Sequence, residues 1–131
     1  MHRPIEVMMN AIDFVVQLPF SWRQQRVQAQ RNSVSRERFI AALANNEIEV
    51  RAAGHLWDKL REIAVVRDFR PCPEDDFLHL YGLADEDLDE DVILAILTVM
   101  EREPPSPAAL QRIGKIRSPR EFMQLFQGHD T

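Results

Sequence analysis

Apolar residues recur at helical spacing along nearly the whole chain, and this periodicity constrains the fold more than any other feature of the sequence. In residues 5–17, 47–66 and 88–100 they repeat every three or four positions, as on the buried face of a helix. No segment alternates apolar and polar residues with the period of two that is typical of a half-buried strand. The sequence therefore predicts an all-α fold, a compact bundle of six to eight helices with no sheet.

Hydroxyl and amide side chains predict where several helices begin. Ser35, Asn46 and Ser118 can accept hydrogen bonds from the first free backbone N–H groups of a helix. Asn46 and Ser118 are followed three positions later by glutamates, as in a capping box. The expected helices are residues 22–32, 36–44, 47–66, 107–113 and 118–126, where 36–44 and 47–66 form either two helices or one.

Two further helix starts are predicted in the acidic middle of the chain. Pro73, followed by Glu74 and two aspartates, suits the first turn of a helix that Gly82 would end. Asp87, with Glu90 three residues later, resembles a capping box for a helix that continues to Met100.

The length of 131 residues suits one domain. Within it we expect an N-terminal helical segment over residues 1–34 and a helical bundle over residues 35–131. The helix expected at 22–32 is rich in Gln and Arg and poor in apolar residues, so it either bridges other elements through solvent or binds a partner.

Cysteine content and hydropathy limit the cellular compartments that fit this sequence. The single cysteine excludes an internal disulfide framework and a multi-cysteine metal site. No apolar run reaches the roughly 18 residues of a membrane-spanning helix, and the start of the chain does not resemble a secretion signal. We therefore expect a cytoplasmic protein.

Charge is strongly segregated along the sequence. Residues 71–103 carry eleven acidic side chains and one basic one, whereas residues 23–38 carry five arginines and one glutamate. An acidic face repels phosphate backbones and attracts basic partners. The candidate partner-binding residues are Asp85, Glu86, Asp87, Asp89, Glu90 and Asp91 at the acidic pole, and Arg23 and Arg26 at the basic one.

Candidate catalytic chemistry is sparse. His79 follows Asp75 and Asp76 on the same expected helix, which could bind a metal or move a proton. Cys72 precedes an expected helix N-terminus, which would lower the pKa of its thiol. The acidic run from Asp85 lacks the glycine and glutamate of a calcium loop, and no phosphate-binding or hydrolase motif is present. We expect no enzyme activity, no cofactor and no metal.

In layout, residues 47–127 resemble acyl-carrier-like proteins. A long helix, a connector, the Gly82-Leu83 turn with its acidic loop, and three further helices follow in the order of that family. In carrier proteins a serine at the start of the second helix holds phosphopantetheine, and Asp87 stands at that position here. The resemblance implies an acidic recognition helix that docks on basic partners, without the prosthetic group.

Taken together, these features favour a non-enzymatic cytoplasmic helical protein that acts through protein–protein interaction. The expected partner is another protein with a basic surface, and the N-terminal helices offer a contact for homo-oligomers. Two alternatives stay open: a small nucleic-acid-binding regulator that uses the arginines of residues 23–38, although the pI near 5.3 disfavours it, and a metal- or thiol-dependent enzyme around His79 and Cys72.

Overall fold

The computed structural model describes residues 20–127, apart from the side chains of residues 112 and 113. Within these residues the chain is all-α: helices are joined by turns, and no strand occurs. The predicted fold class is therefore confirmed. The helix expected over residues 5–17 lies outside the described residues. No helix in the described part of the chain is long and apolar enough to cross a membrane.

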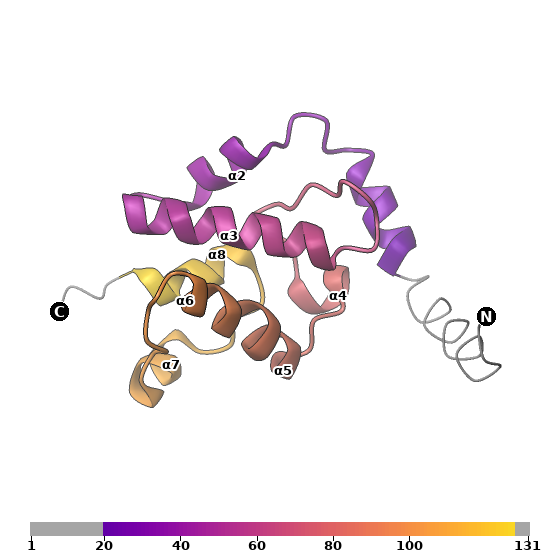
Figure 1. Ribbon diagram of the computed structural model, residues 1–131. Coiled ribbons are helices and arrows are strands. Elements are labelled where there is room, and N and C mark those ends of the chain that lie inside the picture. The colour runs from indigo at the N-terminus through magenta and orange to yellow at the C-terminus, as the bar shows by residue number, and fades with distance from the viewer. Residues whose placement is uncertain (1–19, 128–131) are drawn as a thin grey trace, which may run out of the picture.

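The helices form a bundle around α3, the longest of them (Figure 1). Residues 20–28 form a first helix, shown in indigo. The labelled elements that follow are α2 (Arg36–Leu43), α3 (Glu47–Ile63), α4 (Phe77–Tyr81), α5 (Asp85–Asp87), the π-helix η1 (Leu88–Leu94), α6 (Ala95–Val99), α7 (Pro107–Ile113), α8 (Pro119–Phe122) and the 3-10 helix η2 (Met123–Phe126).

The predicted side-chain caps at three helices are confirmed. The Ser35 hydroxyl accepts from the Arg38 N–H at 3.2 Å, and the Ser118 hydroxyl accepts from the Glu121 N–H at 3.3 Å. Asn46 accepts from the Glu49 N–H at 2.9 Å, while the Glu49 carboxylate accepts from the Asn45 N–H at 3.1 Å. Because this cap starts a new helix, α2 and α3 are separate.

Two predicted helix starts are wrong. Residues 73–76 form a turn and extended backbone, and α4 begins at Phe77 with Asp76 as its cap. The Asp75 carboxylate is directed into the fold, where other groups bind it. In the second case the helix begins at Asp85 rather than after Asp87, because the acids of α5 occupy its first turn, where the helix dipole favours negative charge.

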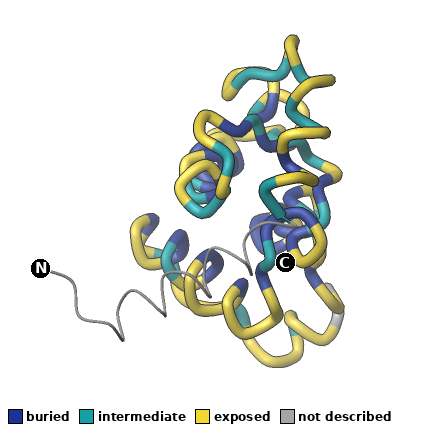
Figure 2. The backbone as a smooth tube through the Cα atoms, turned by 90° about the vertical axis from the view of Figure 1, so that its right-hand side faces the viewer, coloured by how far each residue is buried: buried dark blue, intermediate teal, exposed yellow. Residues whose placement is uncertain are grey.

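The core lies between the α2–α3 pair and the layer formed by α6, α8 and η2. Figure 2 shows the buried segments facing the interior and the exposed ones outside. Phe39 of α2 packs on Trp57 of α3 with ring centroids 5.3 Å apart, and Leu56 and Leu60 of α3 are fully buried. Leu88, Val92 and Ile96 bury the inner side of the α5–η1–α6 helix, which leaves its acidic side outside.

Long-range hydrogen bonds attach the helix of residues 20–28 to the bundle. Gln24 is fully buried; its amide donates to the Leu80 carbonyl at 2.8 Å and accepts from the Val66 N–H at 3.0 Å. Gln28 likewise accepts from the Arg70 N–H at 3.0 Å. This glutamine-rich helix therefore packs against residues 66–81 instead of standing in solvent.

Candidate functional site

The acidic residues singled out in the sequence form one exposed face. All six side chains, on α5 and η1, are exposed: Asp85, Glu86, Asp87, Asp89, Glu90 and Asp91. Among the described residues one ion pair reaches this set, between Asp85 and Lys115 at 3.4 Å. We refer to these six residues as the acidic face. It carries a concentrated negative charge that the rest of the described chain leaves largely uncompensated.

An apolar groove adjoins the acidic face. It has a volume of about 480 Å³ and lies between the α5–η1–α6 helix and the segment from Pro104 to Ile116. Apolar side chains of both walls line it: Leu88, Ile93, Leu94, Leu97, Leu110 and Ile116. Asp85, Asp89 and Glu90 of the acidic face also line it, so the groove has a negative rim.

The π-helix η1 helps to shape this groove. A π-helix forms hydrogen bonds from residue i to i+5, so residues five apart lie on successive turns. In η1 this register places Leu88 next to Ile93, and Asp89 next to Leu94, and all four residues line the groove. Short π-helical segments inside α-helices are found frequently at functional sites.

His79 lies near the acidic face but does not form the predicted set with both aspartates. It is exposed and lines a smaller hollow of about 170 Å³ together with Asp76, Asp85 and Lys115. Asp76 caps α4 by accepting from the His79 N–H at 2.8 Å, whereas Asp75 is directed to the other side. Within residues 20–127, no three His, Cys, Asp or Glu side chains are placed to hold a metal ion.

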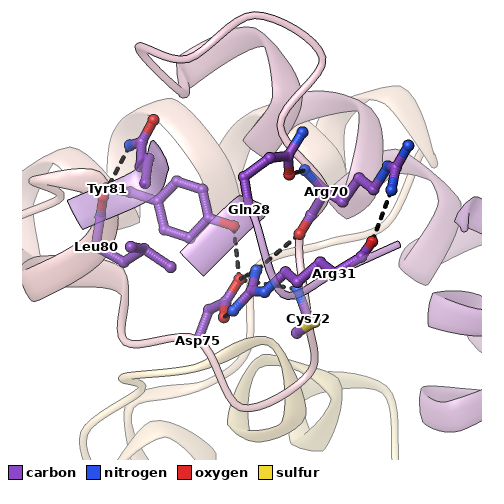
Figure 3. Close-up of polar contacts among 8 residues, drawn as sticks. Gln28, Arg31, Arg70, Cys72, Asp75, Leu80 and Tyr81 are labelled. Carbon is purple, nitrogen blue, oxygen red and sulfur yellow. Dashed lines mark hydrogen bonds and ion pairs between the residues drawn. The ribbon is translucent and has the colours of Figure 1, made fainter. Parts of the chain in front are cut away.

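Asp75 is instead the centre of a buried polar cluster (Figure 3). Its carboxylate accepts from both terminal nitrogens of the Arg31 guanidinium, Nη1 and Nη2, and the Nη1 contact measures 3.0 Å. It also accepts from the Tyr81 hydroxyl and from the Cys72 N–H, each at 2.8 Å. Arg31 in turn donates to the Arg70 carbonyl at 2.7 Å, and Arg70 donates to the Arg31 carbonyl at 2.7 Å.

The environment of this cluster changes the acidity of Cys72. Burial raises the pKa of the Cys72 thiol, the Arg31 charge lowers it, and the Asp75 charge raises it, with a net increase. The expectation of a lowered pKa is wrong, because burial outweighs the Arg31 charge; the helix expected at Pro73 begins only at Phe77. The protonated thiol is the weaker nucleophile and the weaker metal ligand.

The arginines of residues 23–38 are dispersed by the fold. Arg31 enters the buried cluster, and Arg36 pairs with Asp58 at 3.2 Å. Arg23 donates to the His79 carbonyl at 2.8 Å and lies over the Phe20 ring, while Arg26 is exposed. Several arginines of this stretch thus serve contacts within the chain.

Sequence reasoning missed the groove and the buried cluster. One signal for the groove was Leu94, an apolar residue outside the buried stripe of its helix; it is 47% exposed in the structure. The Arg31–Asp75 pair joins residues 44 positions apart and has no local signature. In comparisons with protein-family models, curated proteins and solved structures, nothing matches this chain. The resemblance to acyl-carrier-like proteins stays a prediction.

Proposed function

We propose that this protein acts without catalysis, by binding a partner protein that presents a basic surface to the acidic face. One observation carries the proposal: six carboxylate side chains lie exposed on residues 85–91, and a single ion pair within the described chain reaches them. A field of one sign on this scale speeds the approach of an oppositely charged surface and disfavours acidic partners. The single cysteine supports the cytoplasm as the proposed location.

The acidic face is held on a rigid support, which favours recognition. Leu88 and Val92, on the same helix, are 4% and 0% exposed, so the backbone beneath the carboxylates is fixed in the core. Binding costs less entropy when the interacting groups are already positioned. The exposed Arg26, together with Arg23, offers a second contact on the helix of residues 20–28.

Charge reversal tests the proposal. Tagged protein is used to capture partners from its own cells, and the triple variant D87K/D89K/E90K is compared with the wild type. The control E37K/E47K/E62K makes the same change in net charge at exposed positions of α2 and α3. We expect the acidic-face variant to lose a stoichiometric partner that the control retains, and this partner to dissociate as salt is raised.

Two results would contradict the proposal. One is a partner whose capture is the same for all three proteins and at low and high salt. The other is catalytic turnover or a stoichiometric bound cofactor in the purified chain. Circular dichroism of each variant shows whether a loss of capture reflects a loss of folding.

A further inference from the structure

The groove is open to a second macromolecule, because apolar side chains on both of its walls are exposed. Leu94 of η1 is 47% exposed and Leu110 of α7 is 43% exposed, and both line the groove. Leu97 and Ile116, deeper in the groove, are nearly buried.

The charge at the rim identifies what the groove can accept. Asp85, Asp89 and Glu90 line it, and Lys115, the basic residue among the described side chains that line it, already pairs with Asp85. An apolar floor with a negative rim complements a surface on which apolar residues are flanked by Lys or Arg. Charge complementarity thus selects a basic amphipathic segment.

The shape of the site selects a helix among the ways in which peptides are recognised. Addition of a strand requires an exposed sheet edge, and residues 20–127 contain no strand. Proline-rich segments dock in grooves lined by aromatic rings, and leucines, isoleucines and prolines line this one. A helix docks in an apolar groove through side chains spaced i, i+3, i+4 and i+7, and apolar side chains line both walls of this groove.

We propose that the groove between the α5–η1–α6 helix and the Pro104–Ile116 segment binds a basic amphipathic helix of the partner. The apolar side of that helix enters the groove between Leu94 and Leu110, and its lysines or arginines contact Asp89 and Glu90 on the rim. This inference rests on the proposed function and names the structural element that the partner contributes.

The probe is a synthetic peptide of about 20 residues, longer than the roughly 12–15 residues at which isolated helices are marginal, with leucines on one side of the helix and lysines on the other. A second peptide has the same composition but leucines spread around all sides. Fluorescence anisotropy measures the Kd of each peptide for the full-length protein. We expect the amphipathic peptide to bind at least about tenfold more tightly than its isomer.

Two double variants locate the binding. L94Q/L110Q removes the exposed apolar side chains of the groove, and I48Q/V50Q changes two residues of α3 that are each 44% exposed and do not line it. Since all four positions are exposed, both variants should fold. We expect L94Q/L110Q to weaken binding of the amphipathic peptide about tenfold or more, and I48Q/V50Q to leave it unchanged. Methyl resonances of Leu97 and Ile116 should shift on binding.

Several outcomes would overturn the inference. Equal affinity for the two peptides, or an unchanged Kd in L94Q/L110Q, would mean that charge alone binds the probe. A wild-type protein that dimerises through Leu94 and Leu110, or that retains a small apolar molecule which blocks the peptide, would assign the groove to another occupant. If charge reversal abolishes capture of the partner but the peptide tests fail, the groove inference is wrong and the proposed function stands. If the peptide tests succeed but charge reversal does not affect capture, the proposed function is wrong.

Discussion

The Asp75 carboxylate lies at the centre of the buried polar cluster and accepts hydrogen bonds from Arg31, Tyr81 and the Cys72 N–H. The Asp75 side chain is 3% exposed, and it pairs with Arg31, which is 14% exposed. A buried pair of this kind contributes little compared with apolar packing, but removing one partner leaves a buried charge without compensation. The Tyr81 hydroxyl and the Cys72 N–H donate two further hydrogen bonds to Oδ2 of this carboxylate.

We therefore predict that Asp75→Asn lowers the free energy of unfolding by about 3 kcal/mol. The matched control is Asp58→Asn, which breaks the pair with Arg36, whose side chains are 61% and 46% exposed. Exposed pairs contribute less than about 1 kcal/mol. Urea unfolding followed by tryptophan fluorescence measures both variants, and equal effects would show that the Asp75 cluster contributes no more than a surface pair.

Tyr81 gives a second prediction, because it is the only tyrosine of the chain and its ionisation can be followed directly. Burial, and then the negative charge of Asp75, raise the pKa of the Tyr81 hydroxyl well above its ordinary value of 10.0. The folded state thus holds this proton more tightly than the unfolded state. Its contribution to stability is complete below about pH 10 and is lost as the pH rises further.

The expected result is a tyrosinate absorbance change that begins well above pH 10 and coincides with alkaline unfolding seen by circular dichroism. In Asp75→Asn the change should begin at lower pH, because one cause of the raised pKa is removed. Ionisation of Tyr81 near pH 10 while the helical signal is intact would contradict the burial of this hydroxyl.

At the scale of elements, the sequence predicted the helix boundaries that depend on neighbouring residues. Caps at Ser35, Asn46 and Ser118 depend on residues within three positions of each other, and all three are confirmed. The helix start expected at Pro73 is wrong, because Asp75 pairs with Arg31, 44 positions away, instead of lying in a first turn. The groove beside η1 depends on packing between elements, and Leu94, outside the buried stripe of its helix, was its one local signal.

The end of α4 was also predicted, and it gives a test with an internal control. Gly82 has a φ of 72°, and a Cβ there would lie 3.2 Å from the Phe20 ring. Gly82→Ala should therefore cost at least about 1–2 kcal/mol, the price of a left-handed L-residue. Gly54, inside α3, has an ordinary helical backbone, and its Cβ would meet only the exposed end of Arg36 closely, 2.6 Å from Nη2.

Since the Arg36 side chain can move, Gly54→Ala should be neutral or stabilise by up to about 1 kcal/mol through helix propensity. Thermal unfolding compares the stability of Gly54→Ala and Gly82→Ala with that of the wild type. A Gly54→Ala variant that is as unstable as Gly82→Ala would mean that α3 and Arg36 are packed too tightly to adjust.

At the scale of the whole molecule, the contacts of residues 20–34 bear on whether residues 35–131 can fold without them. Gln24 satisfies the Val66 N–H and the Leu80 carbonyl, Gln28 satisfies the Arg70 N–H, and Arg31 neutralises Asp75. Composition alone described residues 22–32 as a polar helix that either bridges other elements through solvent or binds a partner. Its actual role could not be predicted, because the backbone groups that it satisfies lie about 40 residues further along the chain.

A truncated chain of residues 35–131 tests this attachment against a chain of residues 20–131, which keeps every contact named above. Truncation removes the three hydrogen bonds of Gln24 and Gln28 to the backbone named above, each with a net contribution of about 0.5–1.5 kcal/mol, and leaves Asp75 without Arg31 at a cost of about 3 kcal/mol. Their sum is comparable with the whole stability of a small domain, about 5–15 kcal/mol. We expect residues 35–131 to lose cooperative thermal unfolding and dispersed amide resonances, while residues 20–131 retain both. Equal stability of the two chains would instead make residues 20–34 a separable arm, available to a partner without cost to the bundle.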